Sequence, residues 1–257
     1  MILFFLLSGC SGAKDGVVIA GSTSVQPYIE ILAEDCAIVR PDIEVYVQGG
    51  GSAAGITAAE NETADLGMSS RGLKEEEEWL WSLEIAKDGL AMIIHPQNSV
   101  DELSLDEVRD IYTGKITNWS QIDGPDHAIH VITREEGSGT RSAFESLVMK
   151  EAEINPKCIV QASNGAVKQL VADDPYSIGF ISLGLIDEHV KTIALDNIAP
   201  TKENVINGSY TLARPFLLVA YKAPTAQVKE FVDFIMSERG QKILADEGLI
   251  VQTGGSQ

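Results

Sequence analysis

Cysteine and histidine are scarce in this sequence, with three cysteines and four histidines among 257 residues. No two cysteines have Cys-x-x-Cys spacing, so Cys36 and Cys158 have two interpretations, as buried free thiols or as one disulfide. His127 and His130 are three residues apart in "DHAIH", which puts them on opposite faces of a strand. With so few ligands, we expect neither a metal site nor a cofactor.

Basic residues are also few. The sequence has 19 Lys and Arg against 38 Asp and Glu, a formal net charge of −19. This balance argues against nucleic acid or an anionic lipid surface as an electrostatic partner. It does not exclude a small anion, because one or two cations and local dipoles can hold such an ion. Other charges are largely screened beyond about 8 Å at physiological salt.

The apolar stretch at the start of the chain, "MILFFLLSG", is far shorter than the roughly 20 residues of a transmembrane helix. Cys10 follows it, and "LLSGC" resembles the end of a lipoprotein signal peptide, although no Lys or Arg precedes the apolar residues. We therefore expect residues 1–14 to be a signal and lipid-anchor segment. Cys10 would tether an extracytoplasmic protein to the outer face of the cell membrane, in a periplasm or at the cell surface. The alternative is an apolar N-terminus with a free cysteine.

Apolar and charged residues, at 44% and 22%, are in the proportions of a soluble globular protein, and the length suits two modest domains. Strand and helix patterns alternate along the chain, which predicts an α/β architecture. Three successive predicted strands near the N-terminus each end in hydroxyl residues, at 22–24, 52 and 69–70. Parallel strands end at one edge of a sheet, where ligands bind, so we expect these hydroxyls to converge.

Two strongly apolar segments are candidates for connections between the domains. "GLAMIIHP" (89–96) predicts a strand that passes into a second domain, and "TLARPFLLVAYKAP" (211–224) predicts a strand that returns to the first. We therefore expect one lobe from residues 15–92 and 211–257, and the other from residues 93–210.

The loop "TREEGSGTRSAF" (133–144) is rich in hydrogen-bond donors. It precedes a predicted helix, so the N–H groups of Gly139, Thr140 and Arg141 can donate to an anion, together with the hydroxyls of Ser138 and Thr140. Arg134 or Arg141 can add a guanidinium. The alternative is a capped, glycine-rich turn with solvated arginines, but the density of donors favours anion binding.

Several motifs occur in one order between about Val17 and Val251, namely "GSTSVQP", "QGGGSAAG", "ADLGMSSR", "YTGKITNWSQIDGPD", "REEGSGTR" and "IGFISLG". In this order they resemble the phosphate-binding subunit of phosphate ABC transporters. The resemblance implies a type II periplasmic-binding-protein fold: two α/β lobes with mixed, mostly parallel sheets, joined by two crossover strands. It also implies that the lobes close on inorganic phosphate and deliver it, chemically unchanged, to permease subunits. We expect a monomer.

The resemblance also implies a set of ligand residues. Matched motif by motif, the phosphate ligands are Thr23, Ser24, Ser52, Ser70, Arg134, Ser138, Gly139 and Thr140. Behind them, Glu136 matches an acidic residue of the family that pairs with the loop arginine, and Arg141 lies next to the ligands. Glu135 is interpreted as a solvent-facing neighbour.

Ser70 departs from the family, which often has at this place an Asp that accepts the proton of phosphate. Phosphate near pH 7 keeps at least one proton and sulfate keeps none, so a fixed acceptor separates the two anions. We expect Glu136 or a main-chain carbonyl to take over as the acceptor.

Other functions remain as alternatives. Sulfate, molybdate or tungstate could be the bound oxyanion. A phosphatase-type enzyme is less favoured, because Ser138 lies in "EGSGT" and not in a Gly-x-Ser-x-Gly motif. "YTGKIT" does not match the P-loop of nucleotide-hydrolysing enzymes, because Ile116 occupies the place of the required Ser or Thr. Nucleotide hydrolysis is therefore not expected.

Overall fold

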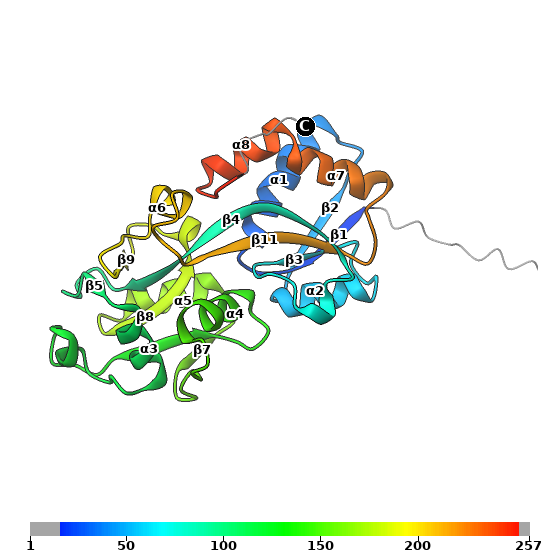
Figure 1. The fold of residues 1–257 in the computed structure, drawn as a ribbon. Helices are drawn as coiled ribbons and strands as arrows, with labels where there is room; N and C mark the ends of the chain where they lie inside the picture. Colours follow the sequence, from blue (N-terminus) through cyan, green and yellow to red (C-terminus); the bar gives the residue numbers. More distant parts are fainter. Residues whose placement is uncertain (1–15, 252–257) are drawn as a thin grey trace, which may run out of the picture.

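The computed structural model describes residues 16–251 and shows two α/β halves connected by two long strands (Figure 1). The predicted anchor, residues 1–14 with Cys10, lies outside the described residues. The connecting strands are β4 (Trp81–Ile94) and β11 (Ala213–Ala220). The alternation of strands and helices predicted from the sequence is confirmed.

The first half is made of the N-terminal elements and the last two helices of the chain. They are β1 (Val17–Gly21), α1 (Gln26–Val39), β2 (Val45–Gly49), α2 (Ser52–Glu60), β3 (Leu66–Ser69), the short helix η1 (Glu75–Glu77), α7 (Ala226–Met236) and α8 (Glu238–Asp246).

The second half is made of the elements between the two connecting strands. They are β5 (Glu102–Leu103), α3 (Leu105–Thr113), η2 (Trp119–Ile122), β6 (His130–Arg134), α4 (Gly139–Phe144), the π-helical turn η3 (Glu145–Met149), β7 (Ile159–Gln161), α5 (Asn164–Asp173), β8 (Ser177–Ser182), η4 (Leu183–Leu185), β9 (Lys191–Thr192), β10 (Ala194–Leu195) and α6 (Lys202–Ile206).

A single mixed sheet runs through both halves, in the order β2-β1-β3-β11-β4-β8-β6-β7, with β9 also paired to β4. β1 is parallel to both β2 and β3, and β6 is parallel to both β7 and β8. The connecting strands pair antiparallel with each other, and β4 then continues alongside β8. The sheet is therefore parallel inside each half and antiparallel where the halves join.

The passage strand is longer than predicted, because β4 begins at Trp81 and not at Gly89. Its first part, "WSLEIAKD", pairs with β11 and mixes exposed with buried side chains. A strand of this kind lacks the continuous apolar run that marked residues 89–96.

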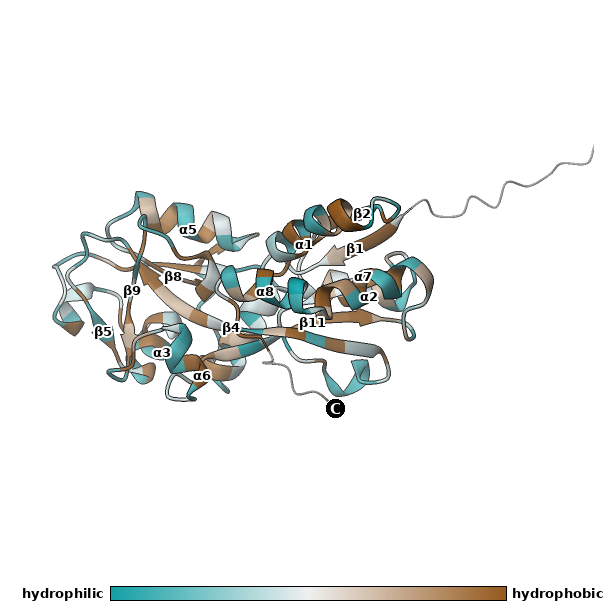
Figure 2. Cartoon of the chain, turned by 90° about the horizontal axis from the view of Figure 1, so that it is seen from above, coloured by the Kyte–Doolittle hydropathy of each residue, from teal (hydrophilic) through white to brown (hydrophobic). Residues whose placement is uncertain are grey.

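Each half has its own hydrophobic core. The first cluster draws on residues 17–86 and 216–249, and includes Ile19, Leu66 and Phe231. The second draws on residues 90–212, where the Phe144 ring stacks on Phe180 with centroids 4.2 Å apart. Figure 2 shows the matching pattern, with apolar residues on β1 and hydrophilic residues on the outer helix α8.

The two cysteines within the described range are both free thiols, so the disulfide interpretation is wrong. Cys36 is buried and Cys158 is partly buried. Burial raises the pKa of Cys36 and raises that of Cys158 to about 11, so both are protonated at neutral pH.

A buried ion pair lies where the two connecting strands meet the second half. Arg214 on β11 is paired across the strands with Asp88 on β4, and its Nε and Nη2 donate to Asp88 Oδ2 at 3.0 and 2.9 Å. The Ser182 hydroxyl on β8 donates to Asp88 Oδ1 at 2.8 Å. The carboxylate thus joins β4, β11 and β8, and both charged side chains are almost fully buried.

We predict that Asp88→Ala lowers the free energy of unfolding by about 3–5 kcal/mol, because the buried Arg214 loses its counter-charge. Urea unfolding measures this loss. The control is Asp233→Ala, which breaks an exposed pair with Lys229 on α7 and should change stability little. Equal losses in the two variants would contradict this role of the buried pair.

Candidate functional site

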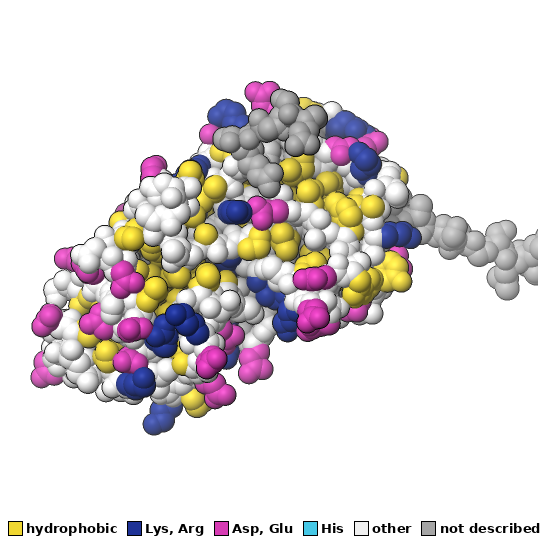
Figure 3. Space-filling model, in the orientation of Figure 1, with side chains coloured by type: hydrophobic (Ala, Val, Ile, Leu, Met, Phe, Trp, Pro, Cys, Tyr) yellow, Lys and Arg dark blue, Asp and Glu magenta, His cyan; other side chains and the backbone are white. Residues whose placement is uncertain are grey.

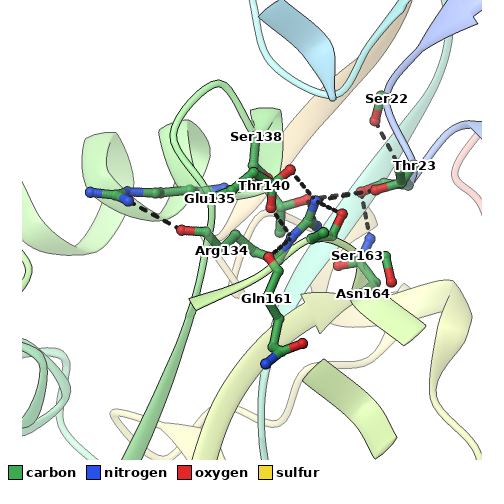
Figure 4. Close-up of polar contacts among 12 residues, drawn as sticks. Ser22, Thr23, Arg134, Glu135, Ser138, Thr140, Gln161, Ser163 and Asn164 are labelled. Carbon is green, nitrogen blue, oxygen red and sulfur yellow. Dashed lines mark hydrogen bonds and ion pairs between the residues drawn. The ribbon is translucent and has the colours of Figure 1, made fainter. Parts of the chain in front are cut away.

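Loops from both halves meet at the ends of the parallel strands. In the first half they follow β1, β2 and β3, and in the second half they follow β6 and β7. Figure 4 shows side chains from these loops, including Thr23, Arg134, Thr140 and Asn164, converging on one place. The convergence of hydroxyl groups predicted from the strand ends is therefore confirmed.

Arg134 lies at the centre of this cluster, at the end of β6, and its side chain is 1% exposed. Its Nε donates to Glu135 Oε2 at 2.9 Å and to the Gln161 carbonyl at 3.1 Å. Its Nη2 donates to Glu135 Oε1 at 2.9 Å, to the Ala162 carbonyl at 3.2 Å and to Thr23 Oγ1 at 3.2 Å. Nη1 has only a long contact of 3.5 Å to Thr140 Oγ1 among the described residues. The guanidinium is thus fixed along one edge, with Nη1 toward the hydroxyls.

The acidic partner of Arg134 is Glu135, so the assignment of Glu136 to this role is wrong. Glu136 is exposed, and Glu135, interpreted as solvent-facing, is only 30% exposed. Within a strand, the side chains of neighbouring residues point to opposite faces, which would direct Glu135 away from Arg134. This alternation does not apply to Glu135, because β6 ends at Arg134. The chain then turns, with Gly137 at φ 84° and the Ser138 N–H bonded to the Glu135 carbonyl at 3.2 Å. This turn folds Glu135 back onto the guanidinium.

Hydrogen bonds across the site join the two halves. Ser24 Oγ and Thr140 Oγ1 lie 2.8 Å apart, with either hydroxyl able to donate. Asn164 Nδ2 donates to Ser24 Oγ at 2.6 Å. At the start of α2, the Ala53 N–H donates to the Gly137 carbonyl at 3.0 Å. With the bond from Arg134 to Thr23, these contacts tie the loops after β6 and β7 to the first half.

A group of buried serines forms the first-half wall of the site. Ser52 Oγ accepts from the Ser70 N–H at 3.0 Å and lies 3.3 Å from Ser70 Oγ, which also accepts from Ser22 Oγ at 2.9 Å. Gly139 of the second half packs directly on this wall. A Cβ atom at position 139 would overlap Ser52 Oγ and Ser70 Oγ. Glycine is therefore required by this close approach.

Ser138 and Arg141 stand at the start of α4. Ser138 caps the helix, and its Oγ accepts from the Arg141 N–H at 3.3 Å. The Arg141 guanidinium bonds to Glu145 at 2.7 Å and to the Arg134 carbonyl at 3.2 Å. Of the two candidate arginines, Arg134 therefore faces the hydroxyls, while Arg141 supports its backbone. The first-turn N–H groups of Gly139 and Thr140 have no partner within the helix.

Asn164 is a site residue that the sequence reasoning missed. It is the first residue of α5, its exposed fraction is 1%, and it contacts Ser24 of the other half. The available signal was the sequence "SNG" after a short strand, which is also an ordinary helix start with Ser163 as the cap.

Between residues 16 and 251, no group of His, Cys, Asp and Glu is arranged to hold a metal ion. In the same range, no helix has the length and apolar character to cross a membrane.

Acidic side chains are scattered over the face drawn in Figure 3.

Comparison with known proteins identifies the class of this chain. The PBP superfamily domain matches residues 9–239. The chain therefore belongs to the PBP superfamily, and the expected periplasmic-binding-protein fold is confirmed.

Relatives narrow the assignment within that superfamily. The chain is 32% identical to the phosphate-binding protein PstS of Bacillus subtilis over 247 residues, 94% of this chain and 82% of the relative. It is 30% identical to PstS of Borreliella burgdorferi, over 97% of both chains. A structure from Clostridium perfringens, described as a phosphate ABC transporter substrate-binding protein with bound phosphate, is 44% identical, with a TM-score of 0.90. The match covers 93% of this chain and 100% of that one. Within the superfamily, the chain is thus a member of the PstS phosphate-binding protein family.

We predict that Glu135→Gln lowers the free energy of unfolding by about 1–2 kcal/mol, because the buried Arg134 loses its counter-charge. The effect is below that for a fully buried pair because Glu135 is partly exposed. The control, Glu136→Gln, changes an exposed neighbour and should leave stability unchanged. Urea unfolding of both variants measures this difference. A larger loss of unfolding free energy in the Glu136 variant would make Glu136, and not Glu135, the acidic partner of Arg134.

Proposed function

We propose that this protein captures inorganic phosphate between its two halves and delivers it, chemically unchanged, to the permease of an ABC transporter. One observation carries the proposal: a buried guanidinium, fixed on one edge, reaches hydroxyls of both halves, with Nη2 bonded to Thr23 and Nη1 at 3.5 Å from Thr140, which itself contacts Ser24. The names of four relatives that are 30–44% identical, which are phosphate-binding proteins or phosphate-transport receptors, support the same ion.

The chemistry of the donors suits a tetrahedral oxyanion. Hydroxyls of Thr23, Ser24 and Thr140 bond to neutral or cationic neighbours of the protein. An anion replaces such neutral pairs by charge-assisted hydrogen bonds, which are roughly twice as strong. The first-turn N–H groups of Gly139 and Thr140 add donors and a helix dipole. Because Glu135 already balances Arg134, these dipoles must offset most of the anion's charge.

Binding and closure are one event in this proposal. The ligand groups are divided between the halves, so an ion contacts all of them only when the halves are together. The ion then stabilises the closed arrangement by population shift, and β4 and β11 serve as the hinge. A micromolar affinity corresponds to about −8 kcal/mol, within reach of five or more charge-assisted bonds after desolvation.

The proposal also covers the lobe boundaries, the oligomeric state, the location and the partners of the protein. We place the lobe boundaries at residues 15–92 with 211–257, and at 93–210. The two separate core clusters support a division close to these boundaries, with Leu90, Met92 and Leu212 packed in the second core. The protein would act as a monomer outside the membrane, tethered through a lipid on Cys10, and its closed form would dock on permease subunits.

We predict that the protein binds phosphate in calorimetric titration, and that Arg134→Ala weakens binding by at least about 100-fold through loss of a buried charged donor. Arg141→Ala, which removes a guanidinium that faces Glu145, should cost no more than about fivefold. Molybdate binding without phosphate binding, or turnover of a phosphate ester, would refute the proposal.

A second test concerns the close approach of Gly139 to the serine wall. Gly139→Ala should weaken phosphate binding by about tenfold or more, because the methyl group holds α4 away from Ser52 and Ser70. Gly50→Ala is the matched control, since its Cβ would meet only the Ala54 methyl group, at 3.6 Å. Unchanged affinity in the Gly139 variant would show that ion binding does not need this contact.

A further inference from the structure

The acceptors of the site are almost all in use. Glu135 directs both carboxylate oxygens at Arg134. The Gln161 carbonyl accepts from Arg134 and from the Glu135 N–H, and the Ala162 carbonyl accepts from Arg134. Ser70 Oγ accepts from Ser22. Glu136 is exposed, and the carbonyls already accept hydrogen bonds from the protein.

One buried acceptor in the cluster has no partner. The amide of Asn164 donates through Nδ2 to Ser24 Oγ at 2.6 Å, and its Oδ1 has no hydrogen-bond partner among the described residues. The side chain is almost fully buried, and the Ser163 cap fixes its backbone at the first position of α5. A buried amide oxygen without a hydrogen-bond partner lowers the stability of the folded protein, so the presence of Asn164 at this position calls for an explanation.

We propose that Asn164 is a further ligand residue and that its amide oxygen accepts the hydrogen bond from the protonated oxygen of bound phosphate. This inference rests on the proposed phosphate-binding function. Asn164 then supplies the fixed hydrogen-bond acceptor for the phosphate proton, a role that the Asp often found in the family at the position of Ser70 would have.

A neutral amide acceptor distinguishes between anions by whether they carry a proton, and not by their net charge. Phosphate at neutral pH carries at least one proton and satisfies Oδ1, whereas sulfate carries none and leaves it unpaired next to an anionic oxygen. Because the amide is neutral, it does not repel either the monoanion or the dianion of phosphate, as a carboxylate would. Arsenate is protonated like phosphate and is accepted in the same way.

The test compares phosphate, arsenate and sulfate in calorimetric titrations of the wild type, Asn164→Ala and Asn164→Asp. The wild type should prefer phosphate over sulfate. Asn164→Ala should reduce that preference by about tenfold or more, with the arsenate-to-phosphate ratio unchanged. Asn164→Asp keeps an acceptor, so it should keep the preference over sulfate while binding both anions more weakly. Asn164→Leu replaces the Ala variant if thermal unfolding shows that Ala is not folded.

The control is Gln169→Ala, which removes an exposed amide from the same helix and should leave both ratios at wild-type values. A merely structural Asn164, acting through Ser24, would weaken phosphate and sulfate alike, and an unchanged ratio in Asn164→Ala would overturn the inference. Equal wild-type affinities for phosphate and sulfate would also overturn it, while leaving oxyanion capture intact. A wild type that binds none of the three anions would instead refute the proposed function.

Discussion

The burial of the Arg134 guanidinium is the constraint on which the rest of the site depends. A charged group with 1% exposure is stable only if its counter-charge and hydrogen-bond acceptors are in place. Glu135 and the carbonyls of residues 161 and 162 meet this need on one edge, and they come from the loops after β6 and β7. The pairing of these two strands is therefore a condition for the orientation of the guanidinium, which places Nη2 on Thr23 and Nη1 toward Thr140.

A second buried arginine has a different role. Arg214 and Asp88 neutralise each other at the junction of β4, β11 and β8, and neither contacts the hydroxyl cluster through a hydrogen bond in the described residues. This pair fixes the register of the connecting strands, whereas the Arg134–Glu135 pair fixes the direction of a donor. The proposed closure depends on both pairs, because it must bring Gly139 against Ser52 and Ser70.

Much of the fold and part of the site could be predicted from the sequence. The β-branched runs, the glycines and the hydroxyls after β1, β2 and β3 were sufficient for an α/β fold with ligand residues at one sheet edge. The loop after β6 was identified because its donors are contiguous in sequence. The first part of β4 was missed, since a strand with mixed exposure has no continuous apolar run.

Two features of the site depend on geometry that no local pattern records. The choice between Glu135 and Glu136 is made by the turn at Gly137, and adjacent glutamates look alike in sequence. Asn164 belongs to the site only because α5 begins beside Ser24, which is 140 positions away along the chain. Its sequence context is that of any capped helix.

In the proposed function, one anion is held by groups from both halves at once. A crystal structure of the protein grown with phosphate tests it most directly. We expect a phosphate ion within hydrogen-bond distance of Arg134 Nη1, of the α4 first-turn N–H groups, and of hydroxyls from the loop at residues 22–24. A phosphate ion bound to one half alone, or away from Arg134, would contradict it.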